Sequence, residues 1–417
     1  MHQALSLLEK DDSVSRLEEL IEKLCPDGVE YKELGTVATI SRGGSFQKKD
    51  FVENGFPCIH YGQIYTRYNL FVNDVVSHIS AQNAEKQKKA VHGDIIMAIT
   101  SENIEDVCKC VAWLGNGELA VSGHTAIIHH KLEPKYLTYY LNSNLFFRQK
   151  LKFVQGTKVI EASPDKLKKV KIPAPPLEVQ REIVRILDQF KELTAELTAE
   201  LTARKKQYEY YRDELITKCN APKVELRQII KKSCSGATPA KGHSEYYENG
   251  TIPWLRTQDV RFNEIHDIHS FITEKAVKET AAKWIPENCV IVAISGASAG
   301  RCAINKIKTT TNQHCLNMEI DDAKALYKYV YYCVASQYQE LLSRKQGARG
   351  DLNSSLILGL QIPLPSLEEQ HRIVSILDRF DALCNDLTSG LPAEIEARRK
   401  QYEYYRDKLL TFKEVPV

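Results

Sequence analysis

The sequence predicts a mixed α/β (α+β) protein with two pseudo-symmetric domains separated by a long antiparallel two-helix coiled coil. Three observations support this fold class: a long internal duplication, a long amphipathic helix pattern in each copy, and apolar strand-like runs between the helix patterns. Duplication is a strong sign of organisation, because each copy is expected to fold as one structural unit.

The duplication is clearest in two segments. Residues 172–190 (IPAPPLEVQREIVRILDQF) match residues 362–380 (IPLPSLEEQHRIVSILDRF) at 12 of 19 positions, and residues 204–216 match residues 398–410 at 10 of 13. Both copies of the second segment contain QYEYYRD. The offset grows from 190 (362 minus 172) to 194 (398 minus 204), so the second copy carries four extra residues between these segments.

Weaker similarity extends through the rest of the chain, where the apolar run IIMAIT (95–100) corresponds to VIVAIS (290–295). A short helix around residues 13–24 precedes Val29 as the first long helix precedes Val224, so we expect the two ends of the chain to lie close together. The expected segments are a lead-in helix at 1–28, a domain at 29–171, a conserved helix at 172–220, a second domain at 221–361 and a conserved helix at 362–417.

Composition narrows the class of protein. A chain of 417 residues is too long for one ordinary core, and two repeats fit the usual size of a domain. The formal charge of +2 excludes a uniformly basic surface but allows local basic faces. The 11 cysteines include no CxxC pair, so we expect reduced, mostly buried thiols and no metal site. Without an apolar stretch of about 18 residues or a signal peptide, a cytoplasmic protein is expected.

The first helix pattern runs from Leu177 to Leu215, with apolar residues stepping by three, four or seven. The proline-rich tract at 172–176 marks its start and residues 220–222 mark its end. About 40 residues at about 1.5 Å each would form a rod of about 60 Å. In the second pattern, Gly390 and Pro392 should kink or break the helix. We expect the two rods to pair antiparallel; the alternative is that each packs only on its own domain.

Two different domains that alternate with two near-identical helices, each beginning after a Pro-rich tract, resemble the specificity subunit of a type I restriction-modification enzyme. The repeat TAELTAEL at 194–201 resembles the subclass with TAEL units in the central helix. The resemblance covers the whole chain, is specific in the helices, and holds only in outline in the domains.

The resemblance implies that each domain is a target recognition domain that reads one half of a bipartite DNA sequence. The helices would set the spacer between the half-sites and dock two methyltransferase subunits, to which restriction and translocase subunits attach. The chain itself would have no catalytic site. S-adenosylmethionine, ATP and Mg would act in the partner subunits, in agreement with the lack of a GxxxxGK(S/T) phosphate loop and of an (N/D)PP(Y/F) motif in this sequence.

Five segments recur in both domains and carry side chains suited to DNA. Glycine allows the backbone to approach phosphate, lysine neutralises it, and arginine and glutamine match the major-groove edges of guanine and adenine. Ordinary surface turns and strand ends are the alternative interpretation. The candidates are Arg42, Ser45, Lys48, Lys49, Tyr61, Gln63, Arg67, Ser101, Asn103, His124 and Lys158 in the first domain, and Ser235, Thr238, Lys241, Trp254, Arg256, Gln258, Arg261, Ser298, Arg301, Asn312, Gln313 and Arg349 in the second.

Four helix tyrosines are candidates for docking the methyltransferase subunits, because aromatic side chains are enriched at protein interfaces. They are Tyr208, Tyr211, Tyr402 and Tyr405.

Two rival function classes remain. Residues 296–300 (GASAG) satisfy the GxSxG pattern of a serine hydrolase, with Asp321 and His371 as further members of a triad. His371 falls in the helical repeat, which disfavours this hypothesis. The other rival is a non-enzymatic scaffold with two protein-binding domains. Two domains that bind one protein surface should have stayed as alike as the helices, and they have not.

Overall fold

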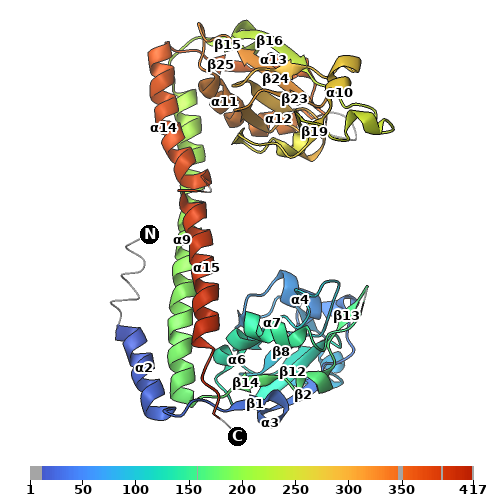
Figure 1. Ribbon diagram of the computed structural model, residues 1–417, viewed down its shortest axis with the longest axis vertical. Coiled ribbons are helices and arrows are strands. Elements are labelled where there is room, and N and C mark those ends of the chain that lie inside the picture. The colour runs from blue at the N-terminus through green and yellow to red at the C-terminus, as the bar shows by residue number, and fades with distance from the viewer. Residues whose placement is uncertain (1–11, 157, 346–350, 387, 416–417) are drawn as a thin grey trace. The chain divides into compact units, whose positions relative to one another are not determined.

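The computed structural model describes residues 12–156, 158–345, 351–386 and 388–415 (Figure 1). The chain forms two compact units. Unit 1 contains the described residues up to Leu197 together with those from Ile395 onward, and unit 2 contains Thr198–Glu394. The conserved helices are therefore shared between the units, and each unit is described by itself below.

Unit 1 contains two five-stranded sheets. One has the order β2 (Ala38–Arg42), β12 (Thr125–His130), β8 (Ile95–Ala98), β10 (Cys110–Trp113), β5 (Phe71–Val72), and the other has the order β3 (Phe51–Val52), β6 (His78–Ile79), β4 (Phe56–Ile59), β11 (Leu119–Val121), β7 (Lys89–Ala90). Two strand pairs accompany them: β1 (Tyr31–Glu33) with β14 (Lys171–Pro173), and β9 (Thr100–Ser101) with β13 (Ile160–Glu161).

The helices of the first domain are short. They are α2 (Asp12–Leu24), α3 (Leu34–Val37), η1 (Lys48–Asp50), α4 (Tyr61–Thr66), α5 (Ala81–Glu85), α6 (Pro134–Leu141), α7 (Asn144–Lys150) and α8 (Pro164–Leu167). Helix α2 is the predicted lead-in helix.

Unit 2 repeats this topology. Its larger sheet has the order β16 (Ile230–Ser235), β24 (Cys315–Ile320), β21 (Val290–Ala293), β22 (Cys302–Asn305), β18 (Asn263–Ile265), and its smaller sheet has the order β19 (Phe271–Ile272), β17 (Ile252–Leu255), β23 (Thr309–Thr311), β20 (Trp284–Ile285). The strand β15 (Lys223–Glu225) pairs with β25 (Gln361–Pro363) as β1 pairs with β14. The helices are η2 (Leu226–Gln228), η3 (Ser244–Tyr246), η4 (Thr257–Asp259), α10 (Glu274–Glu279), η5 (Gly296–Ser298), α11 (Tyr327–Ser336), α12 (Tyr338–Ser343) and α13 (Ser354–Leu358).

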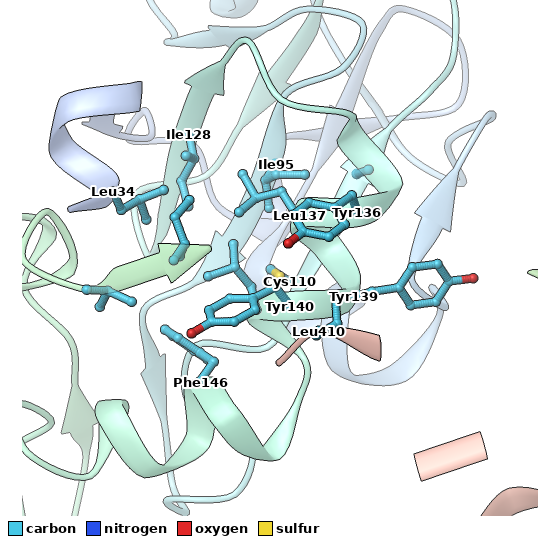
Figure 2. Packing of buried hydrophobic residues seen from close by; sticks show 14 of the residues in the cluster. Leu34, Ile95, Cys110, Ile128, Tyr136, Leu137, Tyr139, Tyr140, Phe146 and Leu410 are labelled. Atoms are coloured by element: carbon cyan, nitrogen blue, oxygen red, sulfur yellow. The ribbon is translucent and has the colours of Figure 1, made fainter. Parts of the chain in front are cut away.

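The central strands of the larger sheets are the two apolar runs that the sequence aligns. Every residue of β8 and of β21 is buried, and each strand pairs antiparallel on both sides. A strand covered on both faces requires an uninterrupted apolar run, which IIMA and VIVA provide. In unit 1, α6 places Tyr136, Tyr139 and Tyr140 against this sheet, and Leu410, just after the last helix, completes the cluster (Figure 2).

The first conserved helix is continuous, as predicted: α9 spans Leu177–Thr217, 41 residues. The second is broken, also as predicted, into α14 (Leu367–Asn385) and α15 (Leu391–Leu409). Asp386 stabilises the break by accepting hydrogen bonds from Thr388 and Ser389. A side chain at Gly390 would come within 2.5 Å of the Ala382 carbonyl oxygen, so the turn requires glycine there.

Each unit contains an antiparallel helix pair built from the same two residue types. In unit 1, Phe190 of α9 stacks on Tyr405 of α15 with ring centroids 5.5 Å apart. In unit 2, Phe380 of α14 stacks on Tyr211 of α9 at 5.7 Å. Phenylalanine comes from the start of one conserved helix and tyrosine from the end of the other, so the two pairs are copies of one interaction. The predicted fold class, with antiparallel packing of the conserved helices, is confirmed.

The repeated glutamine at the start of each conserved helix fixes the helix to its domain. Gln180 accepts a hydrogen bond from the backbone N–H of Glu133 at 2.9 Å and donates one to the Pro175 carbonyl at 2.7 Å. Gln370 makes the equivalent bonds to Leu326 and Pro365, both at 2.9 Å. Both side chains are buried, so their polar groups depend on these partners.

Residues 412–415 close unit 1 by pairing with its beginning. The N–H of Val29 donates to the Lys413 carbonyl at 2.8 Å, and the N–H of Val415 donates to the Val29 carbonyl at 3.2 Å. Gly28 adopts a φ of +117°, and a side chain there would strike the Lys413 carbonyl. The prediction that the two ends lie close together is confirmed for these residues. Within the described residues, no helix is long and apolar enough to cross a membrane.

Candidate nucleic-acid interface

The five candidate segments of unit 1 are connected by direct contacts. Gly44 forms a bridge with Ser122, and the Ser122 hydroxyl accepts a hydrogen bond from the Tyr61 N–H at 3.0 Å. The Tyr65 hydroxyl donates to the Thr100 carbonyl at 2.8 Å. Residues 100–101 pair with residues 160–161. The structure therefore brings all five segments to one part of the unit, as predicted from their repetition.

The corresponding segments of unit 2 are connected in the same way. The N–H of Ala237 donates to the Thr311 carbonyl at 3.0 Å, and the N–H of Asn312 donates to the Leu255 carbonyl at 3.0 Å. Ile294 accepts a hydrogen bond from the N–H of Leu352 and donates one to the His314 carbonyl, both at 2.8 Å. The first two contacts join three segments of the predicted set, 233–242, 253–263 and 311–314. Ile294 and Leu352 lie one residue outside the segments 295–301 and 345–351, and residues 346–350 lie outside the described residues.

Strand register identifies which residues of the two units are equivalent. Arg42 pairs with Ala126 in β12, and Ser235 pairs with Leu316 in β24, so Lys48 and Lys241 both lie six residues beyond equivalent positions. Ile59 pairs with Val121, and Leu255 pairs with Thr311, which makes His60 equivalent to Arg256. By the same register, His124 is equivalent to His314.

The backbone at positions 60 and 256 is held identically. The N–H of His60 donates to Oε1 of Gln63 at 2.8 Å, and the N–H of Arg256 donates to Oδ2 of Asp259 at 2.8 Å. Each residue caps a helical turn, and the residue three positions later closes the cap. The same backbone thus presents different side chains in the two units.

In unit 1 this position lies in a cluster of aromatic and basic groups. The rings of His60 and Tyr61 are 4.5 Å apart, and those of Tyr61 and His124 are 5.1 Å apart. Burial, together with the nearby Lys48 and His124, lowers the pKa of His60 from 6.5 to about 4. The imidazole is therefore neutral at physiological pH, and its Nδ1 accepts a hydrogen bond from the Gly62 N–H at 3.2 Å.

Most of the predicted DNA-contacting residues are accessible. The exposed ones are Arg42, Ser45, Lys48, Lys49, Arg67, Asn103, His124, Lys158, Thr238, Lys241, Gln258, Arg261 and Gln313, and the half-buried ones are Tyr61, Ser101, Ser235, Arg256, Ser298 and Arg301. Arg42 forms an ion pair with Glu161 at 3.3 Å. Arg349 lies outside the described residues.

Several cations of the two faces, unlike Arg42, have no acidic partner among the described residues. Within the described part of the chain, no carboxylate forms an ion pair with Lys48, Lys49, Lys241, Arg256 or Arg301. Lysine and arginine without internal partners are available to phosphate and base edges.

Three predicted residues are buried and support the face rather than form it. Gln63 donates to the Ser77 hydroxyl at 2.7 Å in addition to closing the His60 cap. Trp254 donates through Nε1 to the Ala237 carbonyl at 3.0 Å. Asn312 accepts a hydrogen bond from the His314 N–H at 3.1 Å. Their polar groups are already occupied.

The structure also places the four helix tyrosines within the units. Tyr208 is 9% exposed in the core of unit 2, Tyr402 packs against the core of unit 1, and Tyr211 and Tyr405 stack on Phe380 and Phe190. Tyr211 is nevertheless 38% exposed, and the neighbours Tyr210 and Tyr404 are more exposed, at 62% and 64%.

Sequence reasoning missed His60 and His314. The signal was available, because aligning Phe56-Pro57 with Ile252-Pro253 places His60 opposite Arg256.

The hydrolase arrangement is not formed. Among the described residues, Ser298 makes no side-chain hydrogen bond to Asp321 or His371, and the Asp321 carboxylate is paired with Lys324 at 3.2 Å. His371 lies on α14. No group of three or more potential metal ligands occurs among the residues that were described.

Comparison with known proteins agrees with this geometry. The family model described as type I restriction modification DNA specificity domain matches residues 26–204 and 221–397. The chain is 39% identical over 258 residues to the Escherichia coli type I restriction enzyme EcoR124I/EcoR124II specificity subunit, covering 59% of this chain and 63% of that protein. It spans less than two thirds of that relative. It is 32% identical over 315 residues to a putative type I restriction enzyme specificity subunit of Haemophilus influenzae, covering 71% and 77%.

Two solved structures share the fold. One, from work on complex assembly and conformational transition of the type I R-M system, has a TM-score of 0.66 at 19% identity and covers 92% of this chain and 97% of that chain. The HsdS subunit of Thermoanaerobacter tengcongensis has a TM-score of 0.50 at 18% identity, with 94% and 99% covered. With two matched specificity domains on a repeated frame, the chain belongs to the family of type I restriction-modification DNA specificity subunits.

Proposed function

We propose that each unit of this specificity subunit reads one half of a bipartite DNA sequence through the face built from its five converging segments. The observation that carries this proposal is the equivalence of the two faces. Lys48 and Lys241 each follow an equivalent strand by six residues and can both neutralise phosphate, whereas His60 and Arg256 differ at a matching position. A preserved backbone with different side chains suits two unlike half-sites.

The chain supplies recognition and its partners supply catalysis. In the proposed assembly, two methyltransferase subunits bind S-adenosylmethionine and methylate an adenine in each half-site after flipping it from the duplex. Restriction and translocase subunits, attached through them, use ATP and Mg and cut DNA that lacks the methyl groups. The assembly acts on chromosomal and incoming DNA, and we therefore place it in the cytoplasm.

The conserved helices form the frame of this proposal. The two TAEL repeats lie within the continuous helix α9, so each four-residue repeat adds about one helical turn to it. We propose that these units set the spacer between the half-sites and mark the subclass with TAEL repeats.

Tyr210 and Tyr404 are the helix aromatics best placed to dock the methyltransferase subunits, because they are exposed and recur in both copies. Replacing both with Ala should weaken assembly with the methyltransferase by roughly tenfold or more, as expected for truncated interface aromatics. Titration of purified methyltransferase into the purified chain measures this. The matched control is Glu209→Ala with Glu403→Ala, and equal effects of the two double variants would contradict a specific role for the tyrosines.

The function is tested by mapping methylated adenines across the genome of the host, with and without this gene. We expect one bipartite motif with a fixed gap to lose its methylation when the gene is removed. An unchanged pattern with the partner subunits expressed would favour a protein-binding scaffold instead.

A further inference from the structure

His60 caps the turn after β4 in unit 1, and Arg256 caps the turn after the equivalent strand β17 in unit 2. Both backbones are fixed by the same cap at 2.8 Å, so the difference lies in the side chain alone. A position with fixed backbone and variable side chain, inside a DNA-binding face, has the properties of a base-reading position.

Arg256 is held by an aromatic surface and not by an acidic partner. Its Cζ lies 5.8 Å from the centre of the Trp254 ring, and Trp254 is itself fixed by its bond to Ala237. The Nε atom of Arg256 is buried and has no hydrogen-bond partner. Aromatic stacking orients the guanidinium plane but leaves its donors unused, so no strong bond must break before the side chain engages a ligand.

The side chain lines a pocket of about 480 Å³ together with Thr238, Lys241, Trp254 and Phe271. Lys241 is exposed and forms no ion pair with a carboxylate of the described residues. The pocket thus contains the exposed ammonium group of Lys241 and the planar guanidinium group of the half-buried Arg256. These two cations are suited to different parts of DNA, the first to a phosphate and the second to two acceptors in one plane.

We infer that Arg256 reads a guanine in the half-site bound by unit 2, by donating two hydrogen bonds to O6 and N7 in the major groove. Guanine is the base that presents two acceptors there, and arginine matches both. This inference rests on the proposed function, because it assumes that the face of unit 2 contacts DNA.

Unit 1 provides the contrast. His60 accepts the Gly62 N–H through Nδ1, so the neutral ring carries its proton on Nε2 and offers a single donor. One donor cannot satisfy O6 and N7 together. His60 is also only 8% exposed. The two-bond contact to guanine is therefore expected in unit 2 alone.

The test uses the chain co-expressed with its own methyltransferase subunits, and the methylated motif is mapped for the wild type and three variants. Arg256→Gln removes the fork, Arg256→Lys keeps the charge without the fork, and Lys241→Gln is the matched loss of a neighbouring cation. Both Arg256 variants should lose discrimination at one guanine of one half-site by roughly tenfold to a hundredfold. Lys241→Gln should reduce methylation at all sites equally and leave the motif unchanged.

A second measurement identifies the contacted atom. Replacing that guanine with 7-deazaguanine in a duplex removes N7; it should weaken binding of the wild-type complex and leave binding of the Arg256→Gln complex unaffected. Retention of the other half-site shows that a variant has folded and assembled. If Arg256→Gln abolishes all methylation, the inference is tested instead by whether the motif methylated with Arg256→Lys still requires that guanine.

Two outcomes would overturn the inference. An unchanged motif in Arg256→Lys excludes base reading by the fork, and uniform weakening without loss of discrimination assigns Arg256 to a phosphate. A wild-type complex that methylates no bipartite motif would instead refute the proposed function, so the two failures are distinguishable.

Discussion

At the scale of single residues, polar side chains hold the conserved helices to their domains, and these contacts cannot be predicted from the sequence. The glutamine repeated at positions 180 and 370 is identical in both copies, but identity alone does not reveal that it joins a helix to a domain. Asp188 and Asp378 act similarly, since each binds a lysine and a tyrosine of the neighbouring helix α6 or α11. Such links require knowing which surfaces meet, and helical periodicity does not contain that information.

Gln370→Leu should lower the free energy of unfolding by about 1–3 kcal/mol, because the Leu326 N–H and the Pro365 carbonyl would lose their buried partner. Chemical denaturation of the purified chain measures this. The control is His371→Leu, an exposed neighbour expected to change stability by less than about 0.5 kcal/mol. Equal losses in the two variants would show that the hydrogen bonds of Gln370 do not hold the helix.

His60 should make the protein less stable at mildly acidic pH. Its pKa is about 4 in the folded chain and 6.5 in the unfolded chain, so between these values the unfolded chain binds a proton that the folded chain does not. The free energy of unfolding therefore falls as pH decreases from 6.5 towards 4. In His60→Gln this decline should be shallower, as measured by denaturation at a series of pH values. Burial also lowers the pKa of His130 to about 4. Because His130 is present in both the wild type and His60→Gln, it contributes equally to the two curves and does not affect their difference. Parallel curves would contradict the assignment.

At the scale of the elements, the sequence predicts the long helices well and their inner faces less well. The stepping of apolar residues, the proline-rich start and the break near Gly390 all agree with α9, α14 and α15. Leu193, however, is 37% exposed, and the half-buried position belongs to Thr194. From Phe190, steps of three and four both continue a helical stripe, and packing against the partner decides between them.

The exposure of the helix tyrosines also depends on which helical face packs against a neighbour. Tyr208 and Tyr211 both fit the apolar stripe, but Tyr208 is 9% exposed and has little surface left for another protein, whereas Tyr211 is 38% exposed. The intervening Tyr210 points away from the stripe and is exposed. Side chains on one helical face serve one neighbour, so a residue assigned to the stripe is a poor choice for docking.

Deleting Thr198–Leu201 should narrow the preferred spacer by about one base pair and leave both half-sites unchanged. Four residues shorten a helix by about 6 Å and turn its end by about 40° beyond a full turn, close to the rotation of one base pair. Mapping methylated sites in cells that carry the deletion measures the gap. Altered half-site bases, or an unchanged gap, would refute the spacer function of the TAEL units.

At the scale of the whole molecule, the duplication anticipates the topology of both units. The pairing of β1 with β14 and of β15 with β25 reproduces the alignment of the copies, although these strands are too short to predict individually. The division of the conserved helices between the units was not anticipated. It depends on which helix halves pack together, and the contacts that decide this, Phe190 with Tyr405 and Tyr211 with Phe380, join residues far apart in the sequence.

Exchanging residues 29–150 for the same region of a relative should change one half-site only. The exchanged region contains the face of unit 1, except Lys158, and none of unit 2. The donor must retain tyrosines at positions 136 and 139, because these bind Pro173 and Asp188 outside the exchange. The methylated motif of the hybrid is the measurement, and a change in both half-sites would contradict independent readers.

The closure of unit 1 by residues 412–415 has a consequence for biosynthesis. Unit 2 is one continuous segment of chain, whereas unit 1 needs α15 and the strand that pairs with Val29, which leave the ribosome after all of unit 2. The first half of α9 already contacts the first domain through Gln180 and Asp188, but its face around Phe190 must wait for Tyr405 of α15, encoded about 200 residues later. Although it is translated first, the N-terminal reader is expected to mature last. Premature termination within the last twenty or so codons would thus damage the reader at the opposite end of the gene.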